Sequence, residues 1–270
     1  MNESPDLIAW SQSERMRSST SPLVSPRPRR IVLLGPTGAG KSTQAELLGC
    51  TLGVLPLCTG DIFRGALAHC GDRVSSAMQA ALDSVRRGES VPDHLVMKVL
   101  NERSDGLTCA AGFLLEGFPR TVAQAEALDH LLLEHGFALD AVIAYELPAP
   151  EIMNRLTGRR TCPSCQTIYH LNSRAPTTEG ICDHCHTPLV QRDSDRLHVI
   201  RARLAAYNAN ATPLIGYYRA RGVLLSIAAL GSPQEIFTST LAAFRHATSS
   251  RPPMSAHPFG GQTKRPLYRD

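Results

Sequence analysis

Short apolar runs alternate with stretches of helical periodicity through most of the chain. The apolar runs lie at residues 31–34, 54–58, 112–115, 141–147 and 223–227. The helical stretches lie at residues 41–52, 61–68, 75–87, 93–103, 121–134, 150–156, 195–221 and 233–246. Apolar strands that alternate with helices are typical of a parallel sheet covered on both faces. The pattern predicts an α/β fold with a five-stranded parallel sheet, the first strand at its centre, and ligands at the carboxyl ends of the strands.

Both ends of the chain lack this periodicity. Residues 1–29 are rich in Ser, Pro and Arg, and residues 248–270 are rich in Ser, Pro, Gly and basic residues. We expect two disordered tails that flank a core over residues 30–247. The first tail could instead be a targeting peptide, but its three acidic residues do not fit the acid-poor composition of transit sequences.

Composition narrows the classes of protein. Apolar residues make up 43% of the chain and charged residues 19%, with a net charge of +4. These values argue against disorder throughout and against the basic surface of a nucleic-acid-binding protein. The sequence has no apolar run of about 18 residues and no signal-peptide pattern at its start. We therefore expect a cytoplasmic protein that binds small phosphate ligands and has no membrane or nucleic-acid partner.

The octapeptide GPTGAGKS at residues 35–42 joins the first predicted strand to the first predicted helix. Its glycines allow backbone N–H groups to turn toward a triphosphate, and Lys41 adds a positive charge. The helix that follows directs its positive end at the same anion. The segment has the strand, loop, lysine, hydroxyl and helix that a nucleotide-binding loop requires. It is therefore better explained as such a loop than as a chance glycine-rich turn.

Four cysteines form two Cys-x2-Cys pairs in a stretch rich in Pro and Gly: Cys162, Cys165, Cys182 and Cys185. This spacing predicts a closed tetrahedral zinc site, which is structural because it leaves no position for a reacting water. Disulfides are an alternative, and His170, His184 or His186 could replace a cysteine as ligand. The remaining cysteines are scattered, and we expect them to be buried apolar residues.

Six blocks along the chain carry a family resemblance. They are GPTGAGKS (35–42), LCTGDIFR (57–64), LEGFPRT (115–121), GRR (158–160), LVQRD (189–193) and TPLIGYY (212–218). In this order, over about residues 30–247, they resemble the signature blocks of the adenylate kinase family. The cysteine insertion falls where long-lid members carry a zinc-bearing lid. The resemblance implies a P-loop NTPase fold with an AMP-binding helical segment at 58–91 and a small zinc-ribbon lid at 158–195.

The activity implied by the resemblance is reversible transfer of the terminal phosphoryl group of Mg-ATP to AMP, which gives two ADP and serves purine nucleotide homeostasis. Such a transfer needs charge neutralisation, in-line placement and exclusion of water. An arginine-rich set of blocks fits that need. The residues that match the catalytic positions of the family are Lys41, Arg120, Arg159, Arg192 and Arg203. A monomer is the expectation for this family.

The resemblance also assigns binding residues. Those matching ATP-binding positions are Gly38, Ala39, Gly40, Lys41, Ser42, Thr43, Arg155, Arg159, Ile168, Tyr169 and Gly231. Those matching AMP-binding positions are Thr59, Arg64, Glu89, Ser90, Val91, Gly117, Phe118, Pro119, Arg120, Gln124, Arg192 and Arg203. The implied cofactors are Mg²⁺, which accompanies ATP, and a structural Zn²⁺ on the four lid cysteines.

Five positions, in four segments of the chain, depart from the pattern of the family. Ser42 stands where many members have Gly, and its hydroxyl could reach Mg²⁺ as in the general P-loop pattern. Glu116 replaces an aspartate and moves the carboxylate about one methylene further, where a water-mediated role toward Mg²⁺ is plausible. Ser194 replaces the first of two consecutive aspartates that would orient arginines. Residues 228–229, both Ala, replace an Asp-Gly turn near the ATP base.

Several alternatives remain open from the residues. A kinase for UMP or CMP is the main rival enzyme, because base choice can rest on a few hydrogen bonds. A regulatory or nucleic-acid-binding protein with a P-loop switch is less favoured, because the cysteine ribbon lacks interleaved basic and aromatic residues. A catalytically idle relative is a third alternative, given Glu116 and Ser194. Asp61 could be catalytic or could cap a helix.

Overall fold

The computed structural model describes residues 28–60, 75–87, 91–102 and 112–249. Several predictions from the sequence lie outside these residues: the helix at 61–68, Asp61, Arg64, Glu89, Ser90 and nearly all of both tails.

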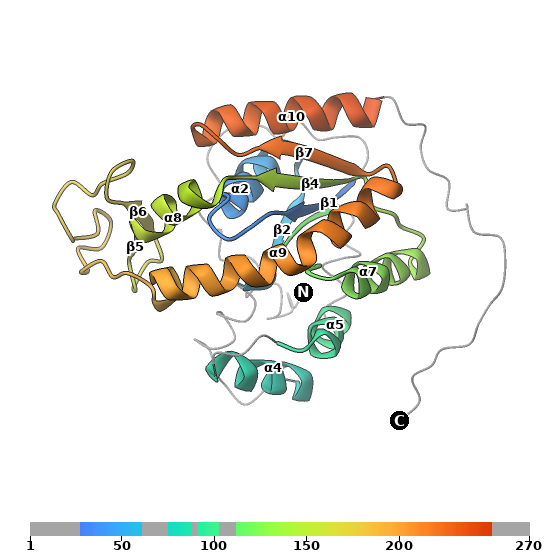
Figure 1. Ribbon diagram of the computed structural model, residues 1–270, viewed down its shortest axis with the longest axis horizontal. Coiled ribbons are helices and arrows are strands. Elements are labelled where there is room, and N and C mark those ends of the chain that lie inside the picture. Colours follow the sequence, from blue (N-terminus) through green and yellow to red (C-terminus); the bar gives the residue numbers. More distant parts are fainter. Residues whose placement is uncertain (1–27, 61–74, 88–90, 103–111, 250–270) are drawn as a thin grey trace, which may run out of the picture.

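Five parallel strands form the central sheet in the order β2-β3-β1-β4-β7. They are β1 (Arg29–Leu34), β2 (Leu55–Cys58), β3 (Gly112–Glu116), β4 (Ala141–Glu146) and β7 (Leu224–Ala228). The prediction of a five-stranded parallel sheet with the first strand at its centre is confirmed. The arrowheads of β1, β4 and β7 point to the side of the molecule on which the lid lies (Figure 1). The loops after these strands and the lid therefore share one edge of the sheet.

The amino end of β1 extends two residues beyond the predicted apolar run. The carboxylate of Asp140 accepts hydrogen bonds from the backbone N–H of Arg30 (2.8 Å) and from Nη1 of Arg29 (3.2 Å). The guanidinium of Arg30 lies 3.5 Å from the centre of the Phe137 ring. These contacts anchor two charged residues at the end of the strand that is remote from the P-loop.

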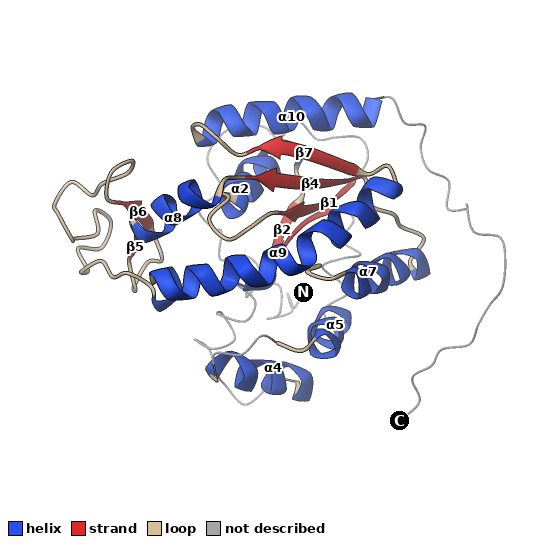
Figure 2. Cartoon of the chain, viewed as in Figure 1, coloured by secondary structure: helices blue, strands red, loops and turns tan. Residues whose placement is uncertain are grey.

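Two layers of helices cover the sheet (Figure 2). On one face, Val32 and Leu34 pack in a core with residues of α7 (Val122–Glu134) and α9 (Leu197–Ala220). On the other face, Ile31 and Leu33 pack with α2 (Lys41–Leu52) and α10 (Pro233–Ser249). This alternation follows from the two-residue period of a strand. Each buried Leu or Ile contributes about 1.5–3 kcal/mol, so both layers hold β1, and with it the P-loop, in place.

Two further parts are attached to this core. Helices α4 (Ser76–Arg86) and α5 (Asp93–Glu102) pack on each other through a small apolar cluster of their own. Helix α8 (Ala149–Thr157) leads into the lid, where β5 (Arg159–Thr161) and β6 (Ile168–His170) pair antiparallel. A short 3-10 turn, η2 (Asp193–Asp195), connects the lid to α9, so the helix predicted over 195–221 begins only at Leu197.

No helix within the described part of the chain is both long and apolar enough to pass through a bilayer.

Candidate active site

The P-loop lies between β1 and α2 and depends on glycine for its shape. Gly35, Gly38 and Gly40 have positive φ angles of 141°, 83° and 85°. A Cβ atom at Gly38 would also lie 2.9 Å from Cγ of Leu156 in α8. Gly40 is the N-cap of α2 and provides no side-chain hydrogen bond to the first turn. The N–H groups at this helix end are thus oriented toward the loop, where a phosphate can accept them.

Lys41 is folded onto its own loop in this structure. Its Nζ donates to the carbonyl oxygens of Gly35 (2.9 Å) and Pro36 (2.8 Å). Burial lowers the pKa of Lys41; the Glu116 carboxylate opposes this shift, while Arg203 and Arg120 add to it. Three charged groups from separate segments therefore lie within electrostatic reach of Lys41, and together with it they give an excess of positive charge that suits a polyphosphate.

Glu116, the last residue of β3, faces the start of α2. Its Oε1 accepts a hydrogen bond from the Ser42 hydroxyl at 3.0 Å. The Glu116 residue is only 8% exposed, and its Oε2 is buried with no hydrogen-bond partner in the described residues. A carboxylate oxygen beside a hydroxyl is the hard-oxygen donor set that Mg²⁺ prefers. The residues present therefore fit the metal ion that accompanies ATP.

Two predicted AMP-binding residues, Thr59 and Gly117, directly follow neighbouring strands, because Cys58 of β2 pairs in register with Glu116 of β3. Just beyond the strand ends, the Thr59 hydroxyl donates to the Glu116 carbonyl at 3.3 Å. A Cβ atom at Gly117, whose φ is 84°, would lie 2.6 Å from the Thr59 hydroxyl oxygen. The following peptide bond, between Phe118 and Pro119, is cis. Glycine at position 117 thus allows Thr59 to lie against this loop.

Arg120 and Gln124 are held together at the start of α7. The Gln124 side chain accepts from the backbone N–H of Arg120 (2.6 Å) and donates to the carboxylate of Asp93. The exposed Arg120 side chain donates through Nε to the Gly117 carbonyl at 2.8 Å. Thr121 caps α7 and also donates to Asp93 at 3.1 Å. Asp93 was not among the site residues predicted from the sequence, because an acidic residue at a helix start is usual for helix stability alone.

Arg155 connects α8 with the loop after β7. Its Nη2 donates to the Ala229 carbonyl (2.9 Å), and Glu151 lies 3.6 Å from its Nε. Ala229 is fully buried, and its own N–H donates to the Glu146 carbonyl. Because Arg155 is bound by a backbone oxygen, this contact does not depend on the side chains at residues 228–229. Gly231, two residues further, is exposed and has a φ of 99°.

Arg159, at the start of the lid, forms a two-pronged contact with Asp195. Its Nε and Nη2 donate to the two carboxylate oxygens of Asp195, at 2.7 Å and 2.5 Å, and Asp195 is fully buried. Arg159 therefore has a carboxylate partner although position 194 is Ser. Arg192 lies just before η2, and Arg203 of α9 is close enough to Lys41 to lower its pKa.

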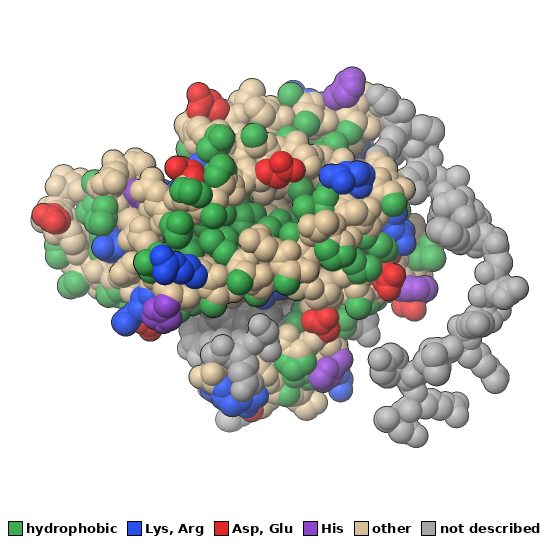
Figure 3. Space-filling view, viewed as in Figure 1, with side chains coloured by type: hydrophobic (Ala, Val, Ile, Leu, Met, Phe, Trp, Pro, Cys, Tyr) green, Lys and Arg blue, Asp and Glu red, His purple; other side chains and the backbone are tan. Residues whose placement is uncertain are grey.

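The two lid residues predicted to contact ATP differ in exposure. Tyr169 is buried; its hydroxyl accepts from the N–H of Asp183 (2.8 Å) and lies 3.6 Å from Sγ of Cys182. Ile168 is 40% exposed. Hydrophobic side chains are visible where the lid joins the core (Figure 3). Of this pair, Ile168 is the one that the structure leaves accessible to a ligand.

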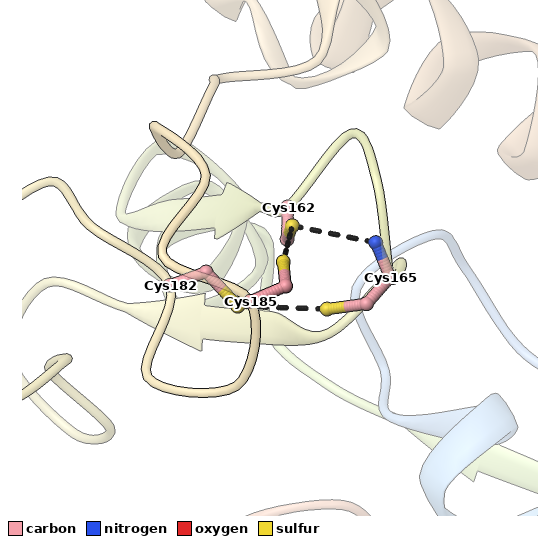
Figure 4. A group of neighbouring side chains, drawn as sticks. All are labelled: Cys162, Cys165, Cys182 and Cys185. Atoms are coloured by element: carbon pink, nitrogen blue, oxygen red, sulfur yellow. Dashed lines mark hydrogen bonds between the residues drawn. The ribbon is translucent and has the colours of Figure 1, made fainter.

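The four lid cysteines converge from two loops (Figure 4). All four Sγ atoms lie within 4.8 Å of one another, with separations of 3.3 Å for Cys162–Cys185 and 3.5 Å for Cys165–Cys182. Bonds of about 2.3 Å from Zn²⁺ to sulfur require separations of about 3.8 Å. The four sulfur positions are thus close to those of a zinc tetrahedron.

The two loops repeat one backbone arrangement. In each, the N–H of the residue after the second cysteine donates to the carbonyl of the first, and that residue has a left-handed φ: 59° at Gln166 and 55° at His186. Hydrogen bonding with Thr187 lowers the pKa of Cys185 to about 6, which favours the thiolate that binds metals, whereas burial raises the pKa of Cys162. The donor set and its surroundings fit zinc.

Neither alternative for the cysteine site is favoured. The six cysteines in the described part of the chain are free, which includes all four of the lid. Among the same residues, the one cluster able to hold a metal ion contains cysteines and no histidine. His170 instead accepts through Nδ1 from the backbone N–H groups of Asn172 and Ser173.

Comparisons with known proteins agree with this site. The profile of the family described as adenylate kinase matches residues 33–223. The chain is 45% identical over 213 residues to the adenylate kinase of Thermodesulfovibrio yellowstonii. This match covers 79% of this chain and 97% of the relative. The chain is 43% identical over 210 residues to the adenylate kinase of Carboxydothermus hydrogenoformans, covering 78% and 96%. These matches, with the P-loop fold, show that the chain belongs to the adenylate kinase family of nucleoside monophosphate kinases.

Proposed function

We propose that this protein transfers the terminal phosphoryl group of Mg-ATP to AMP, and back, with two ADP as the product of the forward reaction. The observation that carries the assignment is that Glu116, Arg120 and Arg203 all lie near enough to Lys41 of the P-loop to shift its pKa. A donor and an acceptor phosphate brought together there carry several negative charges. Converging cations offset that repulsion and stabilise charge on the transferring group.

The ammonium group of Lys41 can exchange its partners in the loop for the phosphates of a bound nucleotide. In this structure its Nζ is bound to two carbonyl oxygens of the loop. Phosphate oxygens are stronger acceptors for an ammonium group than carbonyls are. We therefore expect Lys41 to exchange these carbonyls for the β and γ phosphates, while the amides of residues 38–43 bind the same oxygens.

AMP recognition rests on Thr59, Arg120 and Gln124, with Arg64, Glu89 and Ser90 proposed from the family resemblance alone. The Gln124 amide uses one N–H for Asp93 and accepts one hydrogen bond from Arg120. A side-chain amide has a second N–H and a second lone pair. These match the acceptor and donor on the edge of adenine, and Asp93 fixes which way the amide points.

Lid closure is the step that excludes water. Arg159, Arg192 and Arg203 belong to the lid, its return segment and α9, and they stand in family positions that surround the transferred group. Closing the lid over ATP brings these charges together and keeps water from taking the phosphoryl group. Structural Zn²⁺ on the four cysteines would hold the two lid loops in one shape during that movement.

A cytoplasmic location and a monomeric state stay predictions from composition and from the family.

The test is a comparison of acceptors. Purified protein with Mg-ATP is offered AMP, CMP, UMP and GMP, and ADP formation is followed. We expect AMP to be strongly preferred, and we expect Gln124→Glu to lower kcat/KM for AMP while the KM for ATP is unchanged. Arg120→Ala should lower AMP turnover by about 100-fold, the scale of losing one charge-stabilising donor. Equal use of CMP or UMP would assign a different base specificity.

A further inference from the structure

One buried amide, Gln44, joins two segments that belong to opposite ends of the expected ATP site. Gln44 lies in the first turn of α2, close behind Lys41, and is only 1% exposed. Its Nε2 donates to the carbonyl oxygen of Pro233 at 2.8 Å, although the two residues are 189 positions apart. Pro233 is the first residue of α10. The contact therefore ties the helix that follows the P-loop to the helix that follows β7.

The loop held by this contact runs over residues 229–232 and contains Gly231, which the family resemblance assigns to ATP. It turns into α10 on the side of the molecule where the lid lies (Figure 1). At the start of the loop, both backbone groups of Ala229 are hydrogen-bonded, the carbonyl to Arg155. The two central residues, Leu230 and Gly231, are exposed. A loop held at both ends thus presents its middle to a ligand.

The end of the loop at α10 has a fixed local shape. The Ser232 N–H and hydroxyl both donate to the Glu235 carboxylate at 2.7 Å, and the Glu235 N–H donates to Oγ of Ser232 at 3.3 Å. This reciprocal pair is a capping box, which satisfies the first N–H groups of the helix. A helix start of fixed shape can be positioned through a single contact, and the hydrogen bond from Gln44 to Pro233 is such a contact.

Stability alone explains the Gln44 side chain poorly. Its Nε2 has a partner, but its Oε1 is buried and has none among the described residues. A buried acceptor that is left unpaired costs at least as much as one neutral hydrogen bond contributes. A methionine side chain has nearly the same length and would fill this space without an unpaired oxygen. The amide therefore gives the protein a defined spacing between α2 and α10 and little free energy of folding.

We propose that Gln44 is a positioning residue for the phosphoryl donor: it fixes the start of α10 against α2, and so sets the loop at 229–232 at the distance from the P-loop that one ATP molecule requires. The inference rests on the proposed function, since it concerns the donor nucleotide of that reaction. Gln44 acts through the Pro233 carbonyl and is not among the residues that the family resemblance assigns to ATP. A ligand with both base and phosphates depends on this spacing, whereas a phosphate chain alone depends only on the P-loop.

The experiment separates the base end of ATP from its phosphate end. Calorimetry measures the binding of adenylyl imidodiphosphate and of inorganic tripolyphosphate, each with Mg²⁺, to the wild type and to Gln44→Met. We expect the Kd for the nucleotide analogue to rise about 3–10-fold, the scale of one neutral hydrogen bond, while the Kd for tripolyphosphate is unchanged. In steady-state kinetics the KM for ATP should rise by the same factor and the KM for AMP should stay the same. The melting temperature should not fall, because Gln44→Met also removes the unpaired Oε1.

Thr240→Val is the matched control, because Thr240 makes another buried polar contact of α10. Its hydroxyl lies 3.3 Å from the Tyr145 hydroxyl of β4, about two turns along α10 from Pro233. This variant should lower the melting temperature and leave both Kd values unchanged.

Three results would overturn the positioning role: equal rises in Kd for both ligands in Gln44→Met, no rise for the nucleotide analogue in that variant, or the same rise in Thr240→Val. Phosphoryl transfer to AMP by the wild type is measured separately. If transfer is absent while the two ligands respond as expected, the proposed function fails and the positioning of the nucleotide by Gln44 stands.

Discussion

Two aspartates beside the lid, Asp193 and Asp195, make different contacts. Asp195 is fully buried and binds both arms of Arg159, whereas Asp193 pairs at 2.9 Å with Arg196 and both of those side chains are exposed. Exposed pairs contribute little because water screens them and mobile side chains must be ordered. The two acids around Ser194 therefore have unequal roles.

Replacing Asp195 by Asn should weaken both folding and catalysis. We expect a loss of about 2 kcal/mol in the free energy of unfolding, the scale of hydrogen bonds to charged groups, and a fall in kcat because Arg159 loses its fixed orientation. Denaturant unfolding and steady-state kinetics measure the two effects. The matched control, Asp193→Asn, should change stability by less than about 0.5 kcal/mol. Equal effects of both variants would contradict the assigned roles.

Lys41 is expected to favour function at the expense of stability. Its folded pKa lies below the usual value, so the unfolded chain binds its proton more tightly, and the charge costs stability at neutral pH. This cost is lost as the pH rises from the folded pKa toward 10.5. Lys41→Met should therefore abolish transfer without lowering the melting temperature at pH 7. A fall in stability larger than about 1 kcal/mol would show that its bonds to the loop dominate.

Among the elements, the hinge between α8 and β5 is tightly packed. A Cβ atom at Gly158 would lie 2.5 Å from Nε2 of His170, a residue of β6. The same ring nitrogen lies 3.4 Å from the Asn154 carbonyl in α8. Because the φ of Gly158 is an ordinary −79°, the ring and not the backbone conformation excludes a larger residue.

Gly158→Ala should displace His170 and misplace the lid. We expect a destabilisation of about 1–3 kcal/mol, the usual cost of overpacking, together with a reduced kcat. The double variant Gly158→Ala with His170→Ala gives the methyl group space and should recover most of the loss. Thermal unfolding of the four proteins gives the coupling; additive losses would mean that the ring is not the obstacle.

The lid is expected to depend on its metal for stability more than for chemistry. Removing zinc with a chelator should lower the melting temperature, because the four thiolates would repel one another or bind protons instead. Metal analysis should find one zinc per chain before treatment, and Cys182→Ser should resemble the treated protein. Loss of activity with no change in thermal unfolding would contradict a structural role.

Local patterns predicted the elements well and the tertiary contacts poorly. Each sheet strand lies within two residues of its predicted bounds, because apolar runs and glycine turns are local signals. The three-residue strands β5 and β6 are too short to show a period. The reach of Glu116 to Ser42 and the hold of Asp93 on Gln124 join distant segments, so only the fold reveals them. Burial was misjudged for Cys50, which is exposed, and Cys58, which is half-buried.

At the scale of the whole molecule, the described parts of the site lie at the carboxyl ends of the sheet strands. The P-loop follows β1, Glu116 ends β3, and Arg155 reaches the segment after β7. In a parallel sheet these strand ends share one side, which is where ligands bind in such folds. The lid is attached at that side as well (Figure 1). This architecture therefore suits the proposed transfer between two nucleotides, with the lid beside the edge where they would bind.

The most direct test of this account is ³¹P NMR of the purified protein mixed with Mg-ATP and AMP. The account predicts that ATP and AMP disappear together, that two ADP form for each pair, and that ADP alone regenerates both, with no inorganic phosphate released. Release of inorganic phosphate from ATP without consumption of AMP would contradict it, because water and not AMP would then be the acceptor.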